Sequence, residues 1–274
     1  MSDRRLTPSS GRVAHLSLRG VVDLPLTAGD AARIAAPVTD LCPEPGALRD
    51  RQLLFGAAVT VIDRHEGWCF VQAAWDGYCG WMVAGAVGEP TPATHLVPVP
   101  AAHVYRAASI KDGEVVRLSM GSRVTVLEEA GKFARIAEGW IVRQHLRPVA
   151  VNDTDPVTVA ERLLGTPYLW GGNSRDGIDC SGLVQVALAL CGRSCPGDSD
   201  LQRGALGAPL PEGAPLRRGD LLFWRGHVAM ACDAETLIHA NGHSMTVSHE
   251  NTAACLARIA AAGEGVFHGV WRPN

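Results

Sequence analysis

The segment 179–190 constrains the fold of this chain most, because it reads Asp-Cys-Ser-Gly and continues into an almost wholly apolar run. A run that is apolar on all sides predicts a helix buried inside a domain. Asp179 suits the N-cap of that helix, which places Cys180 at its first turn. Unpaired N–H groups and the positive end of the helix dipole favour a negative charge there. We therefore expect the Cys180 thiol to ionise more readily than a free cysteine and to act as a nucleophile.

A nucleophilic cysteine needs a base from elsewhere in the chain. Short apolar segments bounded by Gly, Asp or Asn fill residues 218–242, a pattern that predicts strands joined by tight turns. His227 opens one of these strands and His239 lies in the next, with residues 233–235 as the turn between them. Neighbouring antiparallel strands can hold such residues side by side on one face. The sequence thus predicts a cysteine, a histidine that takes its proton, and a second histidine that orients the first.

Residues 156–274 resemble the NlpC/P60 family of cysteine peptidases, a circularly permuted relative of the papain fold. The resemblance rests on five motifs in the family's order, namely PYLWGG at 167–172, DCSGL at 179–183, RGDL at 218–221, GHVAM at 226–230 and IHA at 238–240. It implies an α+β, papain-like catalytic domain in which Cys180 attacks, His227 transfers the proton and His239 holds His227. It also implies a reaction that needs no organic cofactor.

The resemblance suggests further residues around the nucleophile. Tyr168 corresponds to a tyrosine whose hydroxyl points towards the reacting carbonyl and forms an oxyanion hole with the backbone N–H of the nucleophile. Asp198 and Ser199 correspond to a pair that meets the amino terminus and a carboxylate of the substrate. The alternative for this pair is a loop that caps the next helix, since both residue types serve there.

Three more residues complete the predicted substrate-binding set. Asp179 and Ser181 flank the nucleophile, and Tyr78 is the best candidate for a tyrosine that closes one end of the groove in related enzymes. The alternative for Tyr78 is an aromatic residue that packs inside a small barrel. Related enzymes also supply an acidic residue near the substrate amine, and residues 47–51 give no clear match to it.

The first half of the chain consists of short strand patterns separated by turn residues. Residues 52–61 and 117–126 share one pattern, and residues 76–82 have a shortened counterpart at 138–141. A repeat about 65 residues apart is too long for a solenoid and fits two copies of a small barrel. Both copies resemble the bacterial SH3 domain.

These patterns predict four parts of the chain. They are an N-terminal lead-in over 1–36 that includes a short helix at 27–34, SH3-like domains over 37–88 and 89–150, and the catalytic domain over 151–274. Asp155 and Pro156 predict the N-cap and first residue of the helix that opens the catalytic domain.

Charge and composition exclude several classes of function. A net charge of −3 gives no basic surface for nucleic acid or anionic membranes, and no run of about 18 apolar residues predicts a membrane span. The charged N-terminus is not followed by an apolar region, so we expect a cytoplasmic protein with reduced thiols. The cysteines at 191 and 195 lack a second pair at ligand spacing, and we therefore predict no metal.

The resemblance implies a cysteine endopeptidase that cuts a murein stem peptide between γ-D-glutamate and the diamino acid. The expected substrate is L-Ala-γ-D-Glu-diamino acid with a free amino terminus, released during cell-wall recycling. Two alternatives stay open: an acyltransferase or amidase on the same fold, and a wall-binding protein whose SH3-like modules do the work. Intact Cys180, His227 and His239 speak against the second.

Overall fold

The computed structural model describes residues 3–263 and 265–273, and the chain divides into two compact units. The first comprises residues 1–151 and the second residues 152–274. The first unit is built almost entirely of strands, whereas the second combines helices with a sheet. Among the described residues, no helix is long and apolar enough to span a membrane.

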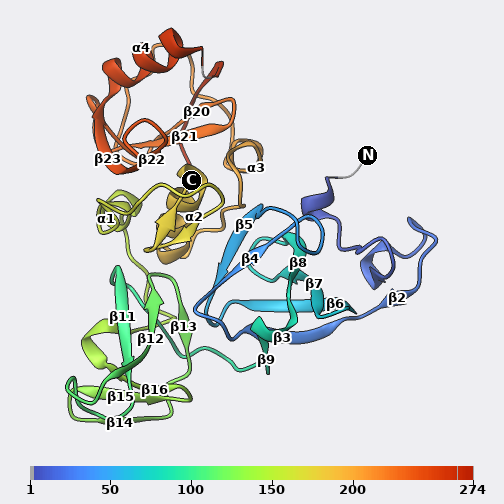
Figure 1. Ribbon diagram of the computed structural model, residues 1–274. Helices are drawn as coiled ribbons and strands as arrows, with labels where there is room; N and C mark the ends of the chain where they lie inside the picture. The colour runs from blue at the N-terminus through green and yellow to red at the C-terminus, as the bar shows by residue number, and fades with distance from the viewer. Residues whose placement is uncertain (1–2, 264, 274) are drawn as a thin grey trace. The chain divides into compact units, whose positions relative to one another are not determined.

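A five-stranded antiparallel sheet forms the first part of unit one (Figure 1). Its strands, in spatial order, are β8 (Cys79–Val83), β7 (Trp68–Ala73), β6 (Ala58–His65), β3 (Asp30–Ile34) and β9 (Val87–Gly88). The hairpin of β4 (Val38–Leu41) and β5 (Arg51–Leu54) joins this sheet through a bridge between Cys42 and Trp81. Phe70 and Trp81 pack edge to face with ring centroids 5.5 Å apart, and both are buried.

The helix predicted over residues 27–34 is wrong, because residues 30–34 form strand β3. Ala32 and Ile34 are buried while Ala31 is exposed, which is the alternation of a strand. Pairing of β3 with β6 and β9 outweighs the helix propensity of the alanines. The sheet of the first module therefore begins before residue 37.

A second group of strands follows in the same unit. One sheet has the strand order β12 (Glu114–Ser119), β11 (Ala101–Tyr105), β16 (Gly139–Val142), β15 (Phe133–Ile136) and β14 (Glu128–Ala130). A smaller sheet has the order β13 (Arg123–Val124), β10 (His95–Leu96) and β17 (Arg147–Pro148). Gly56 and Gly121, at equivalent points of the predicted repeat, both turn with positive φ, at 75° and 89°. Each copy also ends in a one-turn 3₁₀ helix and a short strand, so the repeat has the same local plan.

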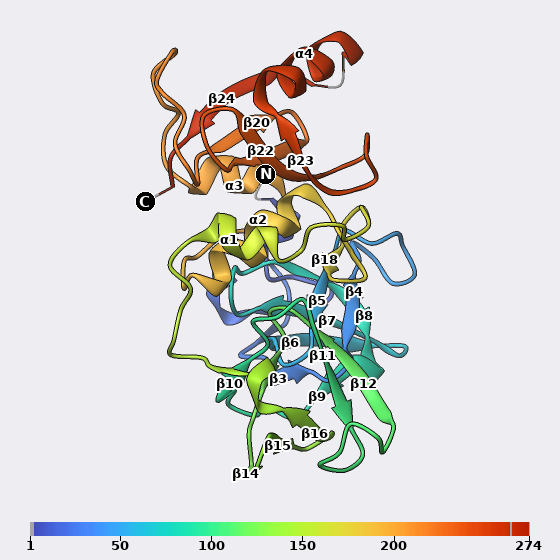
Figure 2. The ribbon, with the colours of Figure 1, turned by 90° about the vertical axis from the view of Figure 1, so that its left-hand side faces the viewer.

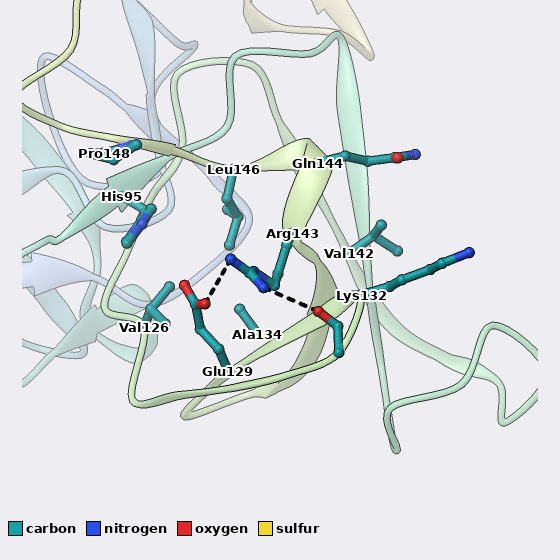
Figure 3. Close-up of a pocket in the computed structure, with 11 residues that line it drawn as sticks. His95, Val126, Glu129, Lys132, Ala134, Val142, Arg143, Gln144, Leu146 and Pro148 are labelled. Atoms are coloured by element: carbon teal, nitrogen blue, oxygen red, sulfur yellow. Dashed lines mark hydrogen bonds and ion pairs between the residues drawn. The ribbon is translucent and has the colours of Figure 1, made fainter.

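An open hollow of about 430 Å³ lies in this second group (Figure 3). Arg143 reaches across it, with its guanidinium 2.7 Å from a Glu129 carboxylate oxygen and donating to the Gly131 carbonyl at 3.1 Å. Its lining includes none of the residues that the sequence predicts for catalysis or substrate binding.

Unit two is an antiparallel sheet covered by helices on both faces (Figures 1 and 2). Its strand order is β23 (Thr246–Asn251), β22 (Thr236–Asn241), β21 (His227–Ala231), β20 (Leu221–Trp224) and β24 (Phe267–Trp271). In both views α4 (Thr252–Ala262) lies on one face, and α1 (Pro156–Glu161) and α2 (Cys180–Leu190) lie on the other. The short helix α3 (Ser199–Ala205) and the β18–β19 hairpin (Asn173–Ser174 and Gly177–Ile178) complete the unit.

The central helix α2 forms where the apolar run predicts it. Asp179 caps it, and all but one of its residues are buried. Asp155 caps α1, with Pro156 as its first residue, as predicted. Helix α2 packs against α1 and against β21 and β22, so the start of α2 lies next to the strands that carry the two histidines.

Candidate active site

The Asp179 carboxylate determines where Cys180 lies. One of its oxygens accepts hydrogen bonds from the Gly182 N–H at 2.7 Å and the Ser181 hydroxyl at 2.9 Å. The other accepts from the Gly171 N–H at 2.9 Å, in the loop that precedes the β18–β19 hairpin. The same side chain therefore caps α2 and fastens the glycine loop beside it.

The first turn of α2 lies directly against that loop. A Cβ on Gly182 would stand 2.5 Å from the Gly172 carbonyl oxygen, and a Cβ on Gly172 would stand 2.5 Å from the Gly177 carbonyl oxygen. Both spaces admit only hydrogen, so glycine is needed at 182 for the contact between α2 and the loop and at 172 for the contact between the loop and the β18–β19 hairpin. Cys180, 5% exposed, is held at this contact as the first residue of α2.

His227 and His239 lie side by side on adjacent strands. His227 Nε2 is 2.9 Å from His239 Nδ1. The second ring nitrogen of His227, its Nδ1, takes no part in this contact. His239 is 1% exposed, whereas His227 is half-buried. The backbone N–H of Val228, the residue after His227, donates to the Cys180 sulfur, so the thiol lies beside the start of β21. The structure therefore brings the three predicted catalytic residues together.

Two residues that sequence reasoning missed continue this chain of side chains. Glu250, on β23, has a carboxylate oxygen 3.0 Å from His239 Nε2. Arg258, on α4, donates to both Glu250 oxygens, from Nε at 2.9 Å and from a terminal nitrogen at 2.8 Å. A signal for Glu250 exists in the hairpin register, since residue 239 pairs with 248 and residue 237 with 250. Residue 250 is then a diagonal neighbour of His239 on the same face.

Burial keeps both histidines neutral. Burial first, and the neighbouring His239 second, lower the pKa of His227 to about 3. Burial lowers the pKa of His239 to about 4, although Glu250 acts in the opposite direction. Hydrogen bonds from Arg258 lower the pKa of the Glu250 carboxyl to about 2, so this group is ionised at neutral pH.

The expected easy ionisation of Cys180 is wrong for this structure. Burial first, and the Asp179 charge second, raise the pKa of the Cys180 thiol to about 12. Backbone N–H groups at the helix start favour the thiolate, but they do not outweigh the loss of water around the sulfur. At neutral pH the cysteine and the histidines therefore rest as uncharged groups.

The other predicted residues of unit two gather around Cys180. Tyr168 is half-buried, and burial first, with the neighbouring Cys180 and Asp179 second, raises the pKa of its phenol. Asp198 acts on Asp179, whose pKa is raised mainly by burial, and Asp198 makes no side-chain cap to α3. Its φ of 55° is left-handed, an unusual conformation for a residue other than glycine.

Ser199 and Ser181 are placed differently from each other. Ser199 is the first residue of α3 and is half-buried. Ser181 is 6% exposed, and its hydroxyl donates a hydrogen bond to Asp179. Gln202 connects their helices by donating to the Ser181 carbonyl at 2.8 Å.

Tyr78 belongs to the other unit and is 1% exposed. The Arg51 guanidinium lies 4.9 Å from its ring centroid and is ion-paired with Asp76. Asp76 also accepts from the Tyr78 backbone N–H at 3.2 Å. Packing inside a small barrel, the alternative considered for Tyr78, describes these contacts.

Two groups of side chains among the described residues have the ligand types that hold metal ions. They are Glu161, Cys232 and His249, and His239, Glu250 and Cys255, with ligand atoms within 4.8 Å of one another in each group. In both groups an arginine already pairs with the carboxylate, Arg218 with Glu161 and Arg258 with Glu250. These arginines compete with a metal ion for the negative charge.

Comparison with known proteins identifies the two kinds of domain. Residues 165–263 match the sequence model of the NlpC/P60 family, and residues 41–87 match that of the bacterial dipeptidyl-peptidase SH3 domain. The chain contains an NlpC/P60 family peptidase domain. The match to a single SH3 domain covers the first group of strands, so a second SH3-like barrel stays a prediction.

Relatives of this NlpC/P60 peptidase cover much of its length. Dipeptidyl-peptidase 6 of Lysinibacillus sphaericus is 28% identical over 69% of this chain and 79% of that protein. The gamma-D-glutamyl-L-lysine dipeptidyl-peptidase of Bacillus subtilis is 30% identical over 63% of each chain. The crystal structure of an NlpC/P60 family protein from Bacillus cereus aligns with 89% of this chain and 99% of that one, at a TM-score of 0.74 and 22% identity. That likeness supports the fold.

Proposed function

We propose that this peptidase hydrolyses the bond between γ-D-glutamate and the following diamino acid in murein stem peptides that begin with a free L-Ala. Two of its relatives, from B. subtilis and B. cereus, are named gamma-D-glutamyl-L-lysine dipeptidyl-peptidases. A dipeptidyl-peptidase releases two residues from an amino terminus, which agrees with a substrate of this kind. Recycling of cell-wall peptides in the cytoplasm is the role that we propose for the reaction.

The observation that carries this proposal is the continuous arrangement of Cys180, His227 and His239. In the proposed reaction the Cys180 proton moves to His227 Nδ1 as the sulfur attacks the γ-carbonyl carbon. The C–N bond then breaks, and His227 returns the proton to the leaving amine, which leaves a thioester on Cys180. Water attacks the thioester with His227 again as the base, and the free thiol is restored.

A neutral resting pair gives His227 a specific task. Because the thiol is protonated at neutral pH, its proton must leave during the attack rather than before it. A neutral His227 can accept that proton, whereas a charged one could not. His239 would hold the ring of His227 in position, and Tyr168 with the Cys180 N–H would bind the oxygen that becomes negative.

Asp198 is the proposed partner of the substrate's amino group. Its carboxylate lies within electrostatic reach of Asp179, the residue before the nucleophile, and does not cap α3. We therefore expect N-acetylation of the L-Ala to reduce kcat/KM strongly, because the acetylated substrate has no ammonium group to pair with the Asp198 carboxylate. Ser199 would bind a carboxylate of the substrate. Asp179 and Ser181 would act through the position of Cys180, and a direct contact of Tyr78 with the substrate stays a prediction.

The test is incubation with L-Ala-γ-D-Glu-L-Lys and with its N-acetyl derivative, followed by mass spectrometry of the products. The expected result is L-Ala-γ-D-Glu and free lysine from the first peptide and almost no products from the second. Equal kcat/KM for the two peptides would overturn the proposed amine recognition. Transfer of the dipeptide to an added amine, with little hydrolysis, would favour an acyltransferase instead.

A further inference from the structure

The side chains behind His227 form one hydrogen-bonded series from β21 to α4. His227 Nε2 meets His239 Nδ1 at 2.9 Å, and His239 Nε2 meets Glu250 at 3.0 Å. Arg258 holds the same carboxylate through two hydrogen bonds, at 2.9 and 2.8 Å. The Cys255 thiol also hydrogen-bonds to Glu250. Three elements of the fold, β22, β23 and α4, therefore contribute to the placement of one carboxylate.

The direction of every hydrogen bond in this series follows from Glu250. An ionised carboxylate only accepts, so the proton between it and His239 belongs to His239 Nε2. A neutral imidazole carries one proton, which makes His239 Nδ1 an acceptor. His227 must then donate from Nε2, and its Nδ1 keeps a lone pair. That is the nitrogen that a proton from Cys180 has to reach.

We propose that Glu250, held by Arg258, is a positioning residue that fixes the ring tautomers of both histidines and so keeps His227 Nδ1 free to accept the Cys180 proton. This inference rests on the proposed function for its activity readout. Without an acceptor at Glu250, His239 can carry its proton on Nδ1 and donate to His227 Nε2. His227 would then carry its own proton on Nδ1, where it could no longer act as the base.

Arg258 allows Glu250 to orient His239 without favouring the charged form of that histidine. An unpaired carboxylate beside His239 would favour the imidazolium form, which cannot accept another proton. Arg258 offsets that charge and lowers the pKa of both histidines. The charged and titratable groups that act on His239 are Glu250 on β23, Arg258 on α4, His227 on β21 and His243 in the turn after β22.

A purely structural role for the Glu250–Arg258 pair is the alternative, because it also ties β23 to α4. Glu250→Leu and Arg258→Leu form a matched pair of variants that distinguishes the two roles. Each breaks the ion pair, but only Glu250→Leu removes the acceptor from His239. At pH 8 we expect Glu250→Leu to lower kcat by about 10–100-fold with little change in KM. Arg258→Leu keeps the acceptor, so its loss of kcat at that pH should be clearly smaller than that of Glu250→Leu.

Nitrogen NMR of the histidine side chains reports the tautomers without any substrate. Both histidines should carry the proton on Nε2 in the unmodified protein and in Arg258→Leu, and lose this preference in Glu250→Leu. Alkylation of Cys180 by iodoacetamide at pH 8 should slow in Glu250→Leu alone. In Arg258→Leu the acid limb of the pH–rate profile should move to higher pH, because the unpaired Glu250 charge raises the pKa of His239.

Several outcomes overturn the inference. Equal losses of kcat in the two variants would mean that the pair only joins β23 to α4, and so would unchanged tautomers in Glu250→Leu. If Glu250→Leu does not fold, the double variant with Arg258→Leu removes both charges, and it must show the same tautomer loss and slow alkylation. If the tripeptide is not cleaved by the unmodified protein while the NMR and alkylation results hold, the proposed substrate is wrong and the role of Glu250 stands.

Discussion

The two sides of the candidate site are built by different means. On the loop side, around residues 166–182, the Asp179 carboxylate binds backbone N–H groups and glycine backbones touch each other. On the strand side, His227, His239 and Glu250 are joined through side-chain atoms alone. Changes on the loop side should therefore cost stability, whereas changes on the strand side should cost proton transfer in a protein that stays folded.

Cys180→Ala gives the largest expected effect, since both sides of the site serve this residue. We expect turnover of the tripeptide to fall to background while circular dichroism and the melting temperature stay close to those of the unmodified enzyme. Cys191→Ala is the control, because Cys191 lies at the other end of α2. Residual hydrolysis by Cys180→Ala, or a comparable loss of turnover in Cys191→Ala, would contradict the assignment of Cys180 as the nucleophile.

The second prediction concerns the strand side. His227→Ala should lower kcat by about 10²–10⁴-fold, because it removes the base. His239→Ala should cost less, and His239→Asn less again, since an amide oxygen can still accept the His227 N–H. His249→Ala, on the exposed side of β23, is the control. If these variants unfold instead of staying folded with a lowered kcat, the proposed difference between the two sides is wrong.

The third prediction concerns the loop side. Gly182→Ala forces a Cβ to within 2.5 Å of the Gly172 carbonyl, so the free energy of unfolding should fall by about 1–3 kcal/mol. Gly204→Ala, on α3 with open space around it, is the matched control and should be neutral or slightly stabilising. Chemical denaturation measures both. Equal free energies of unfolding for the two variants would show that the loop moves to accommodate the added Cβ without loss of stability.

The fourth prediction concerns the pH dependence of stability. The pKa of His239 is about 4 in the folded protein, below its ordinary 6.5, so the unfolded chain binds more protons between these values. Its contribution to stability is present above pH 6.5 and is lost as the pH falls towards 4, at up to about 1.4 kcal/mol per pH unit. Denaturation of His239→Asn should show a flatter acid limb. An unchanged limb would mean that His239 has the same pKa in the folded and the unfolded chain.

The sequence predicts the strand side only as far as its motifs reach. His227 and His239 were found because short apolar strands surround them, and β21 and β22 form as expected. Glu250 was missed because β23 reads Thr-Val-Ser-His-Glu-Asn, a polar strand that suggests a solvated edge. Its function depends on register and on Arg258 from the next helix, and neither is visible in local composition.

Local propensity also fails where tertiary contacts decide. Residues 27–34 contain alanines that favour a helix, yet β3 forms because it fills a place between β6 and β9. Likewise, the position of Cys180 at a helix start predicts a low pKa, while the depth of its burial raises it. Sequence reasoning identifies α2 and its cap, but the amount of water that reaches the sulfur follows only from the packed fold.

The protonated state of Cys180 has a consequence for the durability of the enzyme. Peroxides attack thiolates that are exposed, and Cys180 is neither ionised at rest nor more than 5% exposed. The enzyme should therefore react slowly with peroxides between catalytic cycles, because the Cys180 proton must pass to His227 before the sulfur can attack. Slow oxidation and dependence on His227 then have one cause, the burial that keeps the Cys180 thiol protonated.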